Sequence, residues 1–167
     1  MGYYATIKFR DENVKFKKDI KELNKEIQKK FDGTSFMDVY LESDEKNPRK
    51  LKWIEKTNLT EKYREDYYPF TEFLSNNMEE GMIILGFTGE DGEQWGFVVF
   101  PGLVLEFNGT DDLNGIAIDN IMESKKYQEA IRNNSEAIKY ILPLIEQRKE
   151  EMEKIIKEYQ EFLDNIS

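Results

Sequence analysis

Two hydrophobic periods divide this chain into strand-like and helix-like stretches. In the opening stretch YYATIKF, apolar and polar residues alternate, and a period of two predicts a half-buried strand. From Lys17 to Lys30, apolar residues recur at every third or fourth position. This second period predicts an amphipathic helix that stops at Gly33.

The middle of the chain continues with two more strands and a helix. The stretches TSFMDVYLES and KLKWIEKT predict strands joined through the turn-prone SDEKNPRK. The stretch LTEKYREDYYPFTEFLSNNMEEG predicts a helix with Thr60 as its N-cap. Pro69 should break or kink this helix, so a second helical piece is expected from Pro69 to Met78.

The stretch from Gly81 to Phe107 predicts a three-stranded meander. Asp91-Gly92 and Pro101-Gly102 supply its turns, because glycine tolerates positive φ and proline presets φ. We expect helices to cover one strongly apolar face of the meander, formed by Ile83, Leu85, Phe87, Trp95, Phe97, Val99, Leu103, Leu105 and Phe107. The other face is mixed and carries Gly86 and Gly96. Glycines within strands mark a bulge or a close approach, so we weigh a shallow ligand seat there against helix packing, and favour packing.

The chain is expected to be helical from residue 123 to its end. Residues 123–134 predict a short helix and residues 134–167 a long one, with Pro143 in its first turn or at a kink. The apolar stripe of the long helix is wider than a coiled-coil seam and is interrupted by Arg148 and Lys149. This width favours packing within the domain, with homodimerisation through the helix as the alternative.

These elements predict an α+β fold. We expect an antiparallel sheet that includes the meander, helices packed on one face and a long C-terminal helix. Residues 1–122 would form the sheet domain, and residues 123–167 a helical extension packed on it as part of the same domain.

Composition then excludes several chemistries. The 167 residues include neither histidine nor cysteine, which removes Ser-His-Asp and Cys-His nucleophilic systems and ordinary zinc sites. No phosphate-loop motif is present. The N-terminus lacks a signal-peptide core, and no apolar run is long enough to span a membrane. We therefore expect a cytoplasmic, non-catalytic protein with no cofactor and no membrane partner.

Charge is distributed unevenly along the chain. The net charge is −10, and the segment from Glu61 to Glu123 contains fourteen acidic residues and only two basic ones. Such a segment repels nucleic acid and attracts basic surfaces, so we expect a basic protein partner and no direct nucleic-acid contact. The candidate contact residues are Glu79, Glu80, Glu90, Asp91, Glu93, Asp111 and Asp112. Solubility and internal charge pairing are the alternative explanation.

Two other functions remain open at this point. The first is a small-molecule or nucleotide site built from Tyr67, Tyr68 and Trp95, since such rings stack on bases and sugars. Core packing is the more common role of aromatic residues at these spacings. The second is a hydrolase that uses loop carboxylates, alone or with a metal ion.

Two stretches, MGYYATIKF and GFTGEDGEQWGFVVFPGLVLEF, resemble small accessory proteins of bacteriophages and mobile elements. An E-D-G-x-x-W-[GA]-[YF] hairpin recurs in those proteins, and the resemblance covers about a quarter of the chain. It implies an inhibitor that binds a host defence or nucleic-acid-handling protein. Because the motif is a hairpin signature, it assigns no site residues.

Overall fold

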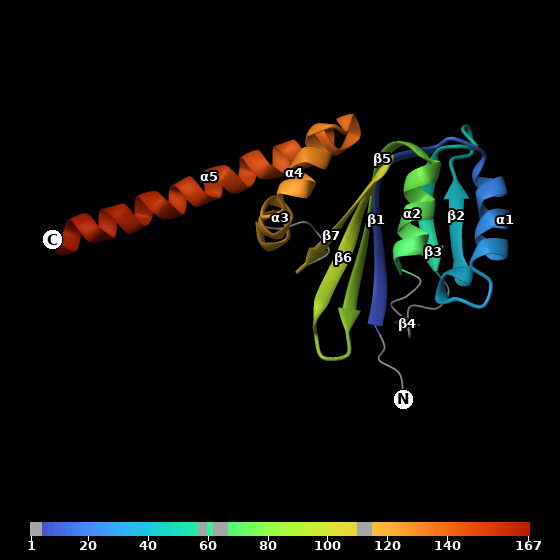
Figure 1. The fold of residues 1–167 in the computed structure, drawn as a ribbon, viewed down its shortest axis with the longest axis horizontal. Helices are drawn as coiled ribbons and strands as arrows, with labels where there is room; N and C mark the ends of the chain where they lie inside the picture. The colour runs from blue at the N-terminus through green and yellow to red at the C-terminus, as the bar shows by residue number, and fades with distance from the viewer. Residues whose placement is uncertain (1–4, 57–59, 62–66, 110–114) are drawn as a thin grey trace.

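The computed structural model describes residues 5–56, 60–61, 67–109 and 115–167. A five-stranded antiparallel sheet has the strand order β4-β1-β5-β6-β7 (Figure 1). These strands are β1 Ala5–Phe16, β4 Thr60–Glu61, β5 Met78–Gly89, β6 Gln94–Phe100 and β7 Leu103–Asn108. A separate hairpin pairs β2 Val39–Ser43 with β3 Leu51–Lys56. The helices are α1 Ile20–Lys30, the short 3₁₀ helix η1 Ser35–Asp38, α2 Tyr67–Asn77, α3 Gly115–Met122, α4 Lys125–Arg132 and α5 Ser135–Ile166.

The predicted α+β class, with an antiparallel sheet and a long C-terminal helix, is confirmed. Strands β5, β6 and β7 pair in sequence order, and β1 adds to them along β5. Gly92 and Gly102 adopt φ of 83° and 74° in the two turns, the left-handed conformation that glycine adopts at little cost.

Both faces of the sheet are buried, whereas the sequence predicted helices on one face only. Helices α1 and α2 and the β2–β3 hairpin lie on one side, and α3, α4 and the beginning of α5 lie on the other (Figure 1). The first face carries Ile83, Leu85, Phe87, Trp95, Phe97 and Val99. The second carries Met82, Ile84, Val98, Phe100, Leu105 and Phe107.

The assignment of β7 to the first face was therefore wrong. Leu105 pairs with Val98, and Phe107 pairs with Gly96. Residues that are directly opposite in a sheet share a face, so Leu105 and Phe107 belong with Val98. Alternation within β7 alone leaves the two faces equivalent, and only the register with β6 decides between them.

The region around Thr60 also differs from the prediction. Thr60 belongs to β4 and pairs with Thr6 of β1, so it does not cap a helix. The described part of α2 runs from Tyr67 to Asn77 and contains Pro69. The helix is continuous over these residues, so Pro69 does not break it there.

Side chains from neighbouring helices form hydrogen bonds to backbone groups of two strands. The buried amide of Asn24 in α1 donates to the Leu41 carbonyl oxygen and accepts from the Leu41 N–H of β2, both at 2.8 Å. On β7, the Glu106 N–H donates to the Tyr127 hydroxyl (3.1 Å). The Asn108 N–H donates to Oδ1 of Asn120 (3.2 Å). These bonds cover backbone groups that would otherwise offer a template for another strand.

Candidate functional site

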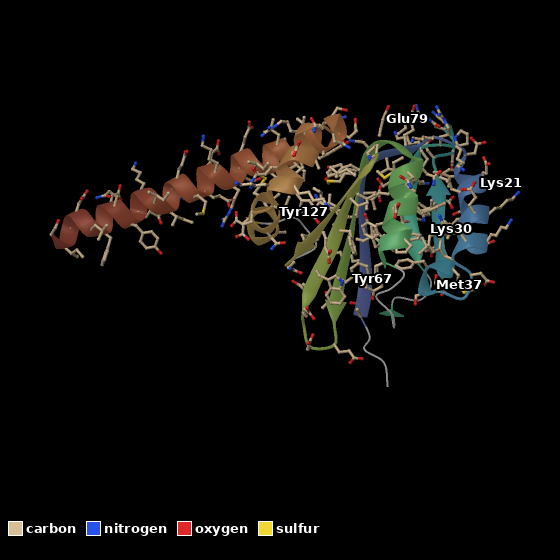
Figure 2. The ribbon with its side chains drawn as sticks, in the orientation of Figure 1. Lys21, Lys30, Met37, Tyr67, Glu79 and Tyr127 are labelled. Carbon is tan, nitrogen blue, oxygen red and sulfur yellow. The ribbon has the colours of Figure 1, made fainter. Side chains whose placement is uncertain are left out.

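The acidic candidate residues do not form one surface. Glu79 and Glu80 lie at the start of β5, while Glu90 and Asp91 lie beyond its other end. The ten residues from Glu80 to Glu90 span about 33 Å of strand. Figure 2 shows Glu79 at the opposite end of β5 from the β5–β6 turn. The candidates therefore divide into two separate groups.

Each acidic group also has an internal role. Glu79 forms ion pairs with Lys15 and Arg49, both at 3.6 Å. In the β5–β6 turn, Oδ1 of Asp91 accepts from the Glu93 N–H at 3.1 Å, a local bond typical of turn residues. Asp111 and Asp112 lie outside the described residues.

The aromatic candidates do not line a common pocket either. Tyr67 and Trp95 are 4% and 5% exposed. Their rings stack on Phe87, with centroid distances of 4.4 Å and 5.5 Å, so both belong to the core of the first face. Tyr68 is 56% exposed and is not part of that stack.

The two paired glycines do not form an open seat. Gly86 and Gly96 face each other across β5 and β6. A Cβ atom on Gly96 would lie 2.5 Å from Cζ of Phe107 and 2.4 Å from the Leu85 carbonyl oxygen. The Phe107 ring therefore fills the space above Gly96, an arrangement in which an aromatic residue covers a strand glycine.

A shallow basic groove of about 510 Å³ lies between α1 and the end of α2. It is lined by Lys18, Glu26, Lys29, Lys30, Phe73, Asn76 and Asn77. Lys18 bonds to Glu26 at 2.6 Å, and this hydrogen bond raises the pKa of Lys18. Lys30 lies over the Phe73 ring at 5.4 Å. The groove also borders the C-terminus of α2, where the helix dipole is negative and disfavours bound anions. The lysines of the groove therefore offset the negative charge of Glu26 and of this helix end.

Within the described ranges, no group of three or more acidic side chains is arranged to hold a metal ion. Across the same residues, no helix combines the length and apolar character needed to cross a bilayer.

The most unusual surface belongs to α5. Its first half, residues 135–148, is called the root here, and residues 149–166 are called the arm. The arm extends away from the rest of the protein (Figure 1), and every one of its residues is exposed. Seven large apolar side chains of the arm are 40–68% exposed. This arm stripe consists of Met152, Ile155, Ile156, Tyr159, Phe162, Leu163 and Ile166.

The arm stripe repeats the face by which the root packs on the sheet. Eighteen residues make five turns of helix, so Tyr159 lies on the same side of α5 as Ile141. Ile141 is fully buried against the second face of the sheet, whereas Tyr159 is 68% exposed. The expected packing within the domain thus holds for the root and not for the arm, because the apolar face continues beyond the sheet.

Polar contacts fix the direction of the root. Glu136 accepts from the Gly81 N–H at 2.8 Å, and Asn134 caps the helix by accepting from the Ala137 N–H. At the end of the root, Arg148 forms two hydrogen bonds to Asp119 of α3, at 2.9 Å and 3.1 Å. These bonds raise the pKa of Arg148. Pro143 lies inside the continuous helix, past its first turn.

An apolar groove of about 350 Å³ adjoins the root. This root groove is lined by Met122, Gln128, Ile131, Arg132, Ile138, Leu142 and Ile145. Ile138 and Leu142 are 37% and 46% exposed. By the five-turn repeat, Ile138 lies on the same side of α5 as Ile156, so the root groove and the arm stripe lie on one side of the helix, with Arg148 and Lys149 between them.

The sequence signalled the stripe of α5 but not its exposure.

Comparison of the chain with protein-family models, curated proteins and solved structures finds no match.

Proposed function

We propose that this protein is a non-catalytic protein-interaction module and that the arm of α5 is its contact element. The observation that carries the proposal is the arm stripe. A fully exposed large side chain presents about 200 Å², so exposures of 40–68% leave roughly 800 Å² of apolar surface on one arm. Soluble monomers rarely expose a contiguous patch above about 600 Å².

Other modes of contact fit this protein less well. Strand addition requires free backbone groups along a sheet edge, and on β7 the Glu106 and Asn108 N–H groups already donate to helix side chains. Membrane-surface helices carry lysine and arginine on their polar face, whereas the arm has six acidic residues and three lysines.

The acidic groups at the two ends of β5 make a secondary contribution to partner binding. They give a negative potential that speeds encounter with a basic protein. The partner class implied by the phage resemblance, a host defence or nucleic-acid-handling protein, remains a prediction.

The proposal is tested with two matched variants. The arm variant, Ile156→Glu with Leu163→Glu, places two carboxylates in the arm stripe. The control variant, Gln147→Glu with Asn165→Asp, adds the same charge on another side of α5. Because Ile156 and Leu163 are exposed, neither variant should unfold the domain, which circular dichroism checks.

Both variants and the parent are then compared by light scattering and by capture of partners from a bacterial lysate. We expect the arm variant to lose assembly or a captured protein that the control variant retains. Equal behaviour of the two variants in both assays would refute the arm as the contact element. Proteins retained by the arm variant and lost as salt rises would instead assign contact to the acidic groups.

A further inference from the structure

We infer that the occupant of the arm stripe is a second copy of this chain, packed antiparallel, with the tip of each arm in the root groove of the other. The tip is defined as Phe162, Leu163 and Ile166. The inference rests on the proposed function, because it uses the same arm as the contact element.

The root groove and the tip are complementary surfaces on one chain. The root groove is an apolar hollow between α5, α3 and α4, and the tip carries three large apolar side chains that are 53–65% exposed. Each molecule therefore offers both halves of the contact. A two-fold antiparallel pair uses both halves twice, which is the property of a self-complementary interface.

The buried area suits a stable pair. Roughly 800 Å² of apolar surface on each arm gives about 1,600 Å² for two copies, the size of a standard protein–protein interface. The stripe is also wider than a two-position seam, because Ile156 and Leu163 lie beside the positions of Met152, Ile155, Tyr159 and Phe162. A wide stripe is expected where a helix contacts more than one element, here the partner's arm and the partner's root groove.

One antiparallel register places Met152 level with the partner's Ile155.

The same register brings the tip to the root. Phe162 then lies level with the partner's Ile145, and Ile166 lies level with the partner's Ile141. In a parallel pair, the tip of one chain would not reach the root groove of the other. The two sheet domains would also lie at the same end and clash beside the roots. The antiparallel pair separates the sheet domains, with the paired helices between them.

This arrangement has a functional consequence. Residues 138–166 of α5 span about 42 Å, so the two sheet domains sit at opposite ends of a rod of roughly that length. Each end presents an identical surface, and a target with two copies of a matching site gains avidity from binding both. The pair is thus a spacer that presents two binding faces at a fixed separation.

The absence of cysteine from the sequence makes disulfide trapping a direct test. Leu142→Cys places a thiol in the root groove, and Ile166→Cys places one in the tip. Lys157→Cys, away from the arm stripe, is the control. Each variant is oxidised alone and in equimolar mixtures, and covalent pairs are separated without reductant and identified by mass spectrometry.

We expect the mixture of Leu142→Cys and Ile166→Cys to form the mixed disulfide at least about tenfold faster than either variant forms its own. Fast Ile166–Ile166 trapping in the single variant would overturn the antiparallel arrangement. Trapping no faster than with the Lys157→Cys control, together with a monomeric mass for the parent chain, would overturn self-association itself. In that second case the proposed function still stands if the arm variant loses a captured protein, so the two failures are distinguishable.

Discussion

Asn24→Ala should destabilise the protein by removing the link between α1 and the β2–β3 hairpin. The Asn24 side chain is 8% exposed, and its amide makes two 2.8 Å bonds to the backbone of Leu41. Its removal leaves one N–H and one carbonyl of Leu41 without these partners. A buried polar group left unsatisfied costs about 1–3 kcal/mol, so the two groups together cost about 2–6 kcal/mol.

We expect a value near the lower end, about 3 kcal/mol, because the smaller side chain leaves space through which water reaches Leu41. For a domain of this size, that loss lowers the melting temperature by roughly 6–12 °C. Lys25→Ala is the matched control, since Lys25 is the next residue of α1 and is exposed. It should change stability by less than about 0.5 kcal/mol.

The assay is urea denaturation followed by circular dichroism, with the slope of unfolding free energy against urea compared between variants. A loss below about 1 kcal/mol for Asn24→Ala, at an unchanged slope, would refute the reasoning that this amide substitutes for a neighbouring strand. A lower slope would show that the hairpin has detached in the native state.

Three further changes test other parts of the structure. Gly96→Ala should lower the melting temperature strongly, because the new Cβ would meet Phe107 and a backbone oxygen; an unchanged melting curve would disprove the close approach. Burial raises the pKa of Asp11 above its ordinary value of 3.8, so its contribution to stability is present below that pH and is lost as pH rises through the folded pKa. Asp11→Asn should therefore stabilise the protein at pH 7, and this gain should vanish below pH 3.8; a gain that persists in acid would contradict the assignment. Arg148→Met removes the two bonds to Asp119 and should speed hydrogen exchange at the end of the root, with no change in α1.

Local patterns were sufficient to predict most elements. Alternation and helical spacing located β1, α1 and the meander, because each depends on residues close in sequence. The face of Leu105 and Phe107 was assigned wrongly, since it depends on the register between β6 and β7. Thr60 was predicted to be a helix N-cap because its pairing with β1 joins residues distant in sequence.

The candidate sites show a similar division. An acidic stretch in sequence does not form one surface when its members lie at opposite ends of a long strand, as Glu80 and Glu90 do along β5. Adjacent aromatic residues diverge because Tyr67 turns into the core while Tyr68 faces outward. The stripe of α5 was visible in the sequence, but its length relative to the sheet was not, so the exposure of the arm emerged only from the fold.

The most direct test of the claim that the arm joins two copies is sedimentation equilibrium of the parent chain and the arm variant over a range of concentrations. The account predicts that the parent chain approaches twice its 19.9 kDa mass. The arm variant, Ile156→Glu with Leu163→Glu, should remain near 19.9 kDa. A parent chain that stays monomeric at every concentration, or an arm variant that assembles as the parent does, would contradict it.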